Sequence, residues 1–242
     1  MRQTFDAFPK LAVASPRFSV YIDGYNLYYA IDHPIPEHLL GLGWCNCQRL
    51  GELLVEKSFV PQSARQHVTV KYFTSSASGA PLSHGEVERQ QLWLDALKDE
   101  APNLTIKWGQ HRPRPQAKGR REEKMTDVKI ALEVAHDIAS VEARPAAAPG
   151  GIVLVSDDLD FQPVVEHAAG AGVPIVVFTP GDRQPYNLEP GKDSSLVRFS
   201  YLTEDLLRKC RLRSDFLPYL RLKVASQPEF AGCLAFEERR GK

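Results

Sequence analysis

Carboxylates follow two short apolar runs of the sequence, at the point where each run ends. Asp23 follows Arg17 to Ile22, and Asn26 comes three residues later. A group of acids also follows Gly151 to Val155: Asp157, Asp158 and Asp160. Carboxylates that converge repel each other unless a divalent cation neutralises them, and oxygen ligands favour Mg²⁺ or Mn²⁺ over zinc. These residues therefore predict a metal site that assists hydrolysis of a phosphate ester.

Asp127 is a third candidate, at the start of a helix predicted over Thr126 to Val141. Glu133, about 120° from the apolar stripe of this helix, is a secondary candidate that could reach the site only from its edge. His136, on the opposite side, is expected to be solvent-exposed. The stripe runs at three- and four-residue steps from Asp127, through Ile130, Ala131, Val134, Ala135 and Ile138. Asp127 is therefore expected on the buried face, where a carboxylate needs a cation or several donors.

Each acid also has a structural interpretation. Asp, Asn and Ser favour the N-cap of a helix, and the helix dipole favours an anion there. Capping accounts for one acid per helix, but it leaves the crowded group after Val155 unexplained. For Asp127 the structural alternative is an acid of the first helical turn, paired with Lys124 or Lys129.

Other catalytic patterns are missing from the sequence. It contains no Gly-x-Ser-x-Gly, no Walker loop and no Gly-x-Gly-x-x-Gly. A phosphoacceptor or small-molecule phosphohydrolase usually pairs its nucleophilic aspartate with an acid one or two residues away. Gly24 and Tyr25 occupy those places after Asp23, which disfavours that class.

The elements that must position these acids alternate along the chain. Apolar or alternating runs predict strands at residues 17–22, 66–73, 104–108, 151–155 and 173–178. Helical composition is found at residues 50–57, 86–98, 126–141 and 159–169. This alternation predicts a doubly wound, mainly parallel α/β sheet with helices on both faces. Ligands of such sheets bind beyond the carboxyl ends of the strands, where the strand order reverses.

Composition limits the classes of partner. The net charge is 0 and the pI is about 7.1, so any attraction for phosphate must be local. No run approaches the roughly 20 apolar residues of a membrane helix, and no signal peptide is evident, so we expect a cytoplasmic protein without a membrane partner.

The cysteines have neither zinc-site nor redox spacing and are expected to be ordinary reduced thiols: Cys45, Cys47, Cys210 and Cys233.

Three motifs occur in a recognisable order. They are Asp23-Gly-Tyr-Asn-Leu after a strand, Lys124-Met-Thr-Asp at a helix start, and Leu-Val-Ser156-Asp-Asp-Leu-Asp-Phe after a second strand. This order, from about Phe18 to Leu207, resembles the NYN domain of the PIN-like nuclease superfamily. The resemblance implies a nuclease domain over residues 18–210, with an N-terminal extension over residues 1–17 and a C-terminal tail over residues 211–242.

The resemblance also implies an Mg²⁺- or Mn²⁺-dependent ribonuclease. The family's catalytic positions correspond here to Asp23, Asn26, Asp127, Asp158 and Asp160. Glu133 matches a secondary acidic position, and Ser156 precedes the last acid group. Asp157 departs from the family, because glycine is usual there, and the extra carboxylate is expected either to join the site or to repel substrate phosphate.

A basic segment precedes the helix that carries Asp127. Residues 112–121 are rich in proline and arginine and are expected to form an exposed loop. The predicted RNA-binding residues are Lys107, Arg112, Arg114, Lys118, Arg120, Arg121 and Lys124. A solvated loop without a ligand is the alternative. Among whole-protein functions, the alternative to a ribonuclease is a non-catalytic RNA-binding module that has kept the fold.

Overall fold

The computed structural model describes residues 17–32, 45–59, 67–75, 84–113, 121–143, 149–180 and 195–212, with single positions between 221 and 238. Most of the predicted N-terminal extension and of the predicted tail lies outside these ranges. So do three of the predicted RNA-binding residues and one cysteine: Arg114, Lys118, Arg120 and Cys233. Within the described ranges no helix is long and apolar enough to cross a bilayer.

Six parallel strands form the central sheet, in the spatial order β3-β2-β1-β6-β7-β8. Their bounds are β1 (Arg17–Asp23), β2 (Val68–Thr74), β3 (Thr105–Trp108), β6 (Pro149–Val155), β7 (Ile175–Thr179) and β8 (Val197–Tyr201). The central strands are nearly continuous runs of buried residues, as expected of a parallel sheet covered on both faces. The predicted parallel α/β sheet is confirmed.

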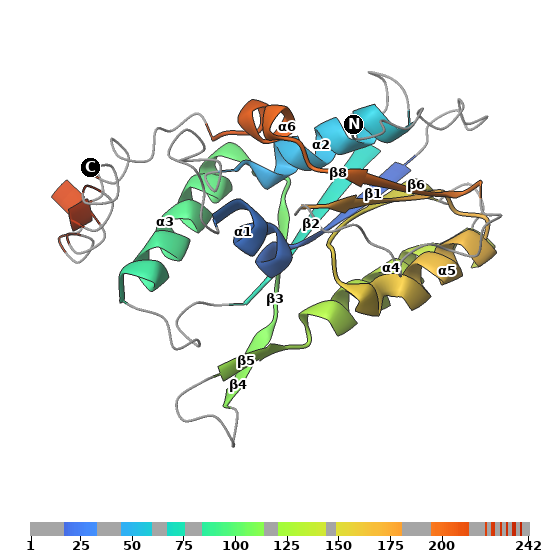
Figure 1. Cartoon of the computed structure of the whole chain (residues 1–242), viewed down its shortest axis with the longest axis horizontal. Coiled ribbons are helices and arrows are strands. Elements are labelled where there is room, and N and C mark those ends of the chain that lie inside the picture. The colour runs from blue at the N-terminus through green and yellow to red at the C-terminus, as the bar shows by residue number, and fades with distance from the viewer. Residues whose placement is uncertain are drawn as a thin grey trace.

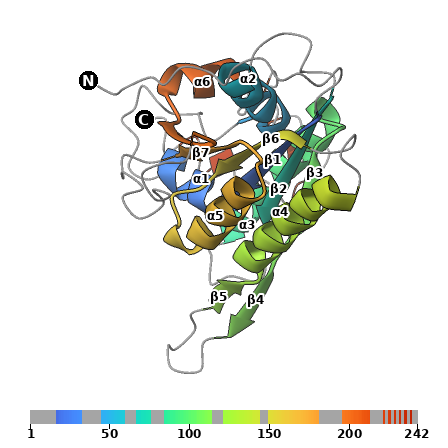
Figure 2. The same cartoon turned by 90° about the vertical axis from the view of Figure 1, so that its right-hand side faces the viewer.

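Helices cover both faces of this sheet (Figures 1 and 2). Their bounds are α1 (Gly24–Asp32), α2 (Cys47–Phe59), α3 (His84–Glu100), α4 (Thr126–Ala143), α5 (Gln162–Gly170) and α6 (Glu204–Lys209), with a 3₁₀ turn η5 (Leu159–Phe161). Side chains alternate along β1, so Val20 and Ile22 enter the core formed with α2 and α6. Tyr21 enters the opposite core, formed with α4 and α5.

The order of the strands reverses between β1 and β6. The chain proceeds outward from β1 through β2 to β3, and then returns to β6 and proceeds in the other direction through β7 to β8. In doubly wound sheets this is where ligands bind, beyond the carboxyl ends of the two neighbouring strands whose connections leave on opposite sides, here β1 and β6. Asp23 and Ser156 lie at this position.

Two parts of the fold differ from the sequence-based expectation. The exposed loop predicted over residues 112–121 begins and ends in an antiparallel ribbon, β4 (Gln110–Pro113) with β5 (Arg121–Lys124). This ribbon projects beyond the body of the molecule (Figures 1 and 2). Neither β8 nor α6 was predicted, because β8 contains polar residues at the sheet edge and α6 is too short to show a helical period. Thr203 caps α6 locally by accepting a hydrogen bond from the Leu206 N–H.

The described cysteines are buried and form no disulfide: Cys45, Cys47 and Cys210. All three belong to the core between the sheet and α2 with α6. They serve as small apolar side chains in that core.

Candidate active site

Asp23 ends β1 and is 5% exposed. Its Oδ1 accepts a hydrogen bond from the Asn26 N–H at 3.1 Å, and its Oδ2 accepts one from the Ser156 hydroxyl at 3.1 Å. One donor thus comes from the first turn of α1 and the other from the end of β6. The buried carboxylate is held in place by both central strands of the sheet.

The group of acids after β6 is tied to the same point. The Asp157 N–H donates to Asn26 Oδ1 at 3.1 Å, and the Asp158 N–H donates to Ser156 Oγ at 3.1 Å. Ser156 is fully buried, and its hydroxyl donates to Asp23 while accepting from the Asp158 backbone. The first and third sequence motifs are therefore joined by a continuous hydrogen-bonded path at the switch point of the sheet.

The capping interpretation applies to two acids at this edge. Asp158 is the N-cap of η5, and its Oδ1 accepts from the Asp160 N–H at 2.9 Å. Asp23 satisfies the first turn of α1 in the same way. A carboxylate has about four acceptor positions, so one capping bond leaves capacity for a cation.

Gly24 explains how a helix can start directly after Asp23. A Cβ at this position would lie 2.4 Å from the Phe73 carbonyl oxygen and 2.5 Å from the Tyr72 ring. Only glycine allows α1 to begin this close to β2. The glycine that follows Asp23 is therefore required by packing.

Asp127 is exposed, which corrects the prediction that it lies on the buried face of its helix. The buried ridge of α4 runs at four-residue steps through Thr126, Ile130, Val134 and Ile138. Asp127 is about 100° around the helix from Thr126, so it leaves that ridge in the first turn.

The first turn of α4 nevertheless lies at the same edge of the sheet as Asp23. Along β1, Ser19 contacts Asp137 and Tyr21 contacts both Asp137 and Glu133, so α4 runs antiparallel to β1. The start of α4 consequently lies towards the carboxyl end of β1. The Lys129 ammonium, which donates to the Trp108 carbonyl at the end of β3, is consistent with this direction.

The acids at this edge differ in burial. Asp23 is buried, Asp157 and Asp158 are half-buried, and Asp127 and Asp160 are exposed. Among the residues that the structure describes, no three acids, histidines or cysteines are positioned together to hold a metal ion. The predicted acids therefore lie towards the same edge of the sheet, but they do not form one compact cluster.

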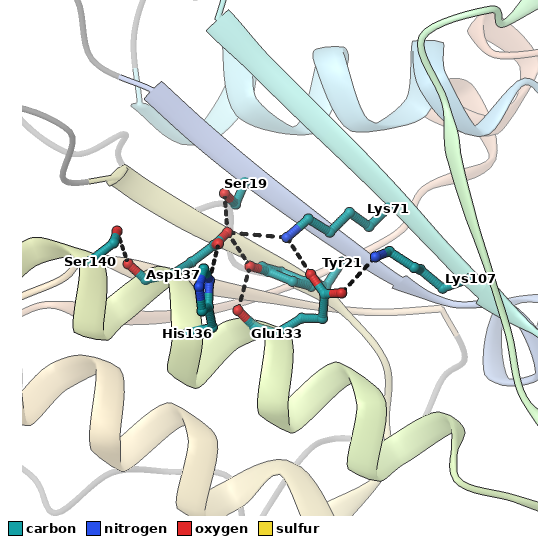
Figure 3. Close-up of polar contacts among 8 residues, drawn as sticks. All are labelled: Ser19, Tyr21, Lys71, Lys107, Glu133, His136, Asp137 and Ser140. Carbon is teal, nitrogen blue, oxygen red and sulfur yellow. Dashed lines mark hydrogen bonds and ion pairs between the residues drawn. The ribbon is translucent and has the colours of Figure 1, made fainter.

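Glu133 does not point to this edge (Figure 3). Its carboxylate is bound by the Lys71 ammonium at 2.8 Å and by the Lys107 ammonium at 2.6 Å. Burial acts to raise the pKa of Glu133, but the hydrogen bonds and charges of Lys107 and Lys71 hold it below its ordinary value. Glu133 thus forms ion pairs that join α4 to β2 and β3, and its secondary role in the site stays a prediction.

Asp137 is the centre of this second polar cluster and was not singled out from the sequence. Its Oδ2 accepts from the Ser19 hydroxyl at 2.7 Å and from the Tyr21 hydroxyl, and the Lys71 ammonium lies 3.4 Å away (Figure 3). Burial acts to raise the pKa of Asp137, but the two hydroxyl groups and Lys71 hold it below its ordinary value. Burial and the Asp137 carboxylate together raise the pKa of Tyr21.

The sequence did carry a signal for Asp137. This residue lies seven positions after Ile130 and three after Val134, which places a carboxylate on the buried stripe of the helix. A charge at such a position requires partners from another element. Ser19, Tyr21 and Asp23 alternate along one face of β1, so the first two hold α4 in place while the third reaches the candidate site.

Stability is expected to fall in acid because of this cluster. The folded-state pKa values of Glu133 and Asp137 are lowered, so their contribution is present above the ordinary carboxyl values of about 4. It is lost as the pH falls through the lower folded-state values. Urea unfolding between pH 7 and pH 3 should show this loss, and the double variant Glu133→Gln, Asp137→Asn should show a flatter dependence. An equally steep dependence in that variant would contradict the assignment.

The basic residues predicted to bind RNA fall into two groups. Lys107 lies in β3 and is engaged with Glu133. The others within the described ranges belong to the ribbon, where the register pairs Arg112 with Glu122, Pro113 with Arg121, and Gln110 with Lys124. The ribbon is thus a projecting arm whose sequence carries both charges.

Comparison with known proteins adds no assignment to this geometry. The chain matches no protein-family model, and no curated protein matches it significantly.

Proposed function

We propose that the protein is a metal-dependent ribonuclease, of the kind to which the NYN-like order of its motifs points. The observation that carries the proposal is the hydrogen-bonded path from Asp23 through Ser156 to the backbone of Asp158, at the switch point of the sheet. This is the position where doubly wound sheets bind ligands.

The donor set fits Mg²⁺ or Mn²⁺. It consists only of oxygens, and Mg²⁺ is usually bound through one or two carboxylates, with water and substrate phosphate completing its shell. Asp23 and Asp158 would hold the ion, which would lower the pKa of an attacking water and neutralise charge on the phosphate.

The remaining residues of the site orient and complete it. Ser156 holds the Asp23 carboxylate at this edge of the sheet, and the Asn26 side chain fixes the backbone at Asp157. Asp127 and Asp160, both exposed, would act from the mouth of the site through metal-bound water. The ribbon, with Arg112, would hold the RNA backbone.

The proposed location is the cytoplasm, where thiols such as those of Cys45 and Cys210 stay reduced.

A non-catalytic RNA-binding module is the second candidate. It is favoured by the lack of a compact three-acid group among the described residues and by the use of Asp158 as a cap. Both candidates predict RNA binding, and only the first predicts cleavage.

The deciding experiment is cleavage of RNA by the purified chain with Mg²⁺, with Mn²⁺ and with excess EDTA. Cleavage is expected with either metal. EDTA should abolish it, because the carboxylates cannot lower the pKa of the attacking water without a bound cation. Either metal should also raise the melting temperature by binding the folded state. Asp158→Asn should bind RNA as well as wild type while cutting far more slowly. Metal-independent cleavage would sink the mechanism, whereas binding without cleavage under all conditions would establish the second candidate.

A further inference from the structure

The face of β2 and β3 beside α4 carries polar side chains and is open to solvent. Thr69 precedes Lys71 by two residues on β2, and Thr105 precedes Lys107 by two residues on β3. Side chains two apart in a strand lie on the same face of the sheet, so these four side chains share one face. Both threonines are exposed. A ligand can therefore reach this face next to the two lysines.

This is also the face to which the Asp23 side chain belongs. The register pairs Asp23 with Phe73 and Phe73 with Lys107, so the three residues form one row across β1, β2 and β3. Lys107 reaches Glu133 on α4, which shows that its side chain is on the α4 face. Two strand spacings place the Lys107 backbone about 10 Å from that of Asp23. The lysine pair thus adjoins the candidate site.

The Glu133 carboxylate lies between the two lysines (Figure 3). Its Oε2 is 2.8 Å from the Lys71 ammonium, and its Oε1 is 2.6 Å from the Lys107 ammonium. The side chains of Glu133 and Lys107 are 30% and 36% exposed, respectively. One anion therefore bridges two cations from neighbouring strands, in a position that solvent can reach.

We propose that Lys71 and Lys107 form a phosphate subsite, which binds a backbone phosphate of the substrate, and that Glu133 occupies this subsite in the free protein. The proposal rests on the proposed function in taking the ligand to be nucleic acid. A phosphodiester has one negative charge and two non-bridging oxygens, so it can replace the carboxylate on the same two ammonium groups. The subsite would take a phosphate near the scissile one and would fix the strand without reading its sequence.

Glu133 can leave the two lysines without releasing α4 or displacing Lys71. The helix is also held to β1 by Asp137, which accepts hydrogen bonds from the Ser19 and Tyr21 hydroxyls. The Lys71 ammonium is 3.4 Å from Asp137 and lies over the Tyr21 ring, 4.9 Å from its centre. Partly exposed ion pairs contribute little to stability, so exchanging the carboxylate for a phosphate costs little.

The test measures binding without cleavage, by titrating the full chain with short single-stranded RNA in excess EDTA at several salt concentrations. Glu133→Gln is expected to raise the affinity about three- to tenfold, because RNA no longer competes with a carboxylate for the two lysines. Lys107→Gln should lower the affinity. It should also make the dependence of log K on log salt shallower, by roughly 0.7 for the one lost contact.

Glu166→Gln is the matched control, because it removes the same charge from α5, where the Glu166 carboxylate accepts a hydrogen bond from Gln162. Its affinity for RNA should equal that of wild type. The double variant Glu133→Gln, Lys107→Gln should lose the gain of Glu133→Gln, since the gain depends on the lysine that the carboxylate releases.

Three results would overturn the proposal. In the first, Glu133→Gln binds RNA no more tightly than wild type. In the second, Glu166→Gln tightens binding as much as Glu133→Gln does, so that net charge alone accounts for the gain. In the third, Lys107→Gln is folded by circular dichroism and keeps both the affinity and the salt dependence of wild type. If Lys107→Gln does not fold, the comparison of the two glutamate variants decides.

The proposed function and this inference can fail separately. A chain that gains RNA affinity in Glu133→Gln but never cleaves RNA would overturn the ribonuclease and keep the phosphate subsite. A chain that cleaves RNA, with the affinity of Glu133→Gln unchanged, would keep the ribonuclease and overturn the subsite.

Discussion

Asp23→Asn is expected to lower the single-turnover rate of RNA cleavage by roughly 100- to 1000-fold at saturating Mg²⁺. The asparagine side chain has nearly the same shape, and its amide oxygen can still accept the hydrogen bond from the Asn26 N–H. It lacks the negative charge that would hold the cation at the site. The effect should therefore appear in the rate and in the Mg²⁺ dependence, and it should exceed any loss of stability that follows because the amide nitrogen cannot accept the hydrogen bond of the Ser156 hydroxyl.

Two further substitutions give this experiment its controls. Asp205→Asn alters an exposed carboxylate on α6 and should leave the rate unchanged. Asp157→Asn tests the acid that departs from the NYN-like pattern. Because Asp157 contributes its backbone N–H to Asn26, replacing its side chain should change the rate only a few-fold. Undiminished cleavage by Asp23→Asn, in a preparation free of contaminating nuclease, would rule out the proposed site.

Asp137→Ala should destabilise the folded protein by about 3 kcal/mol. The Ser19 hydroxyl would lose its acceptor, the Tyr21 hydroxyl would keep only its bond to the Glu133 carbonyl, and the Lys71 ammonium would lose one of its two carboxylates. Donors buried without an acceptor are more costly than the net value of the bonds they made. For a chain of this length the melting temperature should fall by roughly 6–12 °C.

Two variants, Tyr21→Phe and Asp205→Ala, serve as comparisons and are expected to lose less stability than Asp137→Ala. Tyr21→Phe removes one donor and leaves Asp137 with Ser19 and Lys71, so the loss should be about 1 kcal/mol. Asp205→Ala breaks an exposed pair with Lys209 and should change stability by less than about 1 kcal/mol. Equal melting temperatures for Asp137→Ala and Asp205→Ala would show that the cluster between α4 and the sheet contributes no stability.

Much of the fold could be predicted from the order of patterns alone. Apolar runs such as Gly151 to Val155 are short and continuous, so they predict strands buried on both faces, and helical runs between them predict parallel crossovers. The same patterns place acids at strand ends, because a strand's hydrophobic run stops where it leaves the core. The meeting of the first and third motifs follows from this rule, since the carboxyl ends of parallel strands share one edge.

Side-chain partners, in contrast, were decided by the tertiary structure. Glu133 is bound by Lys71, 62 residues away, and by Lys107, 26 residues away, and no local period reports such pairs. The hydrophobic stripe of α4 gives an average direction, whereas only the fold shows that the buried ridge starts at Thr126 and leaves Asp127 exposed.

The sequence by itself thus determined the central strands and most of the helices that cover them, and which acids follow the ends of those strands. Only the tertiary structure decided that Ser156 and Asn26 join the two strand ends and that Glu133 is engaged by two lysines. The physical reason is the distance along the chain over which each kind of interaction acts. Burial patterns reflect interactions within one element, whereas hydrogen bonds and ion pairs act over a few ångström between elements that only the complete fold brings together.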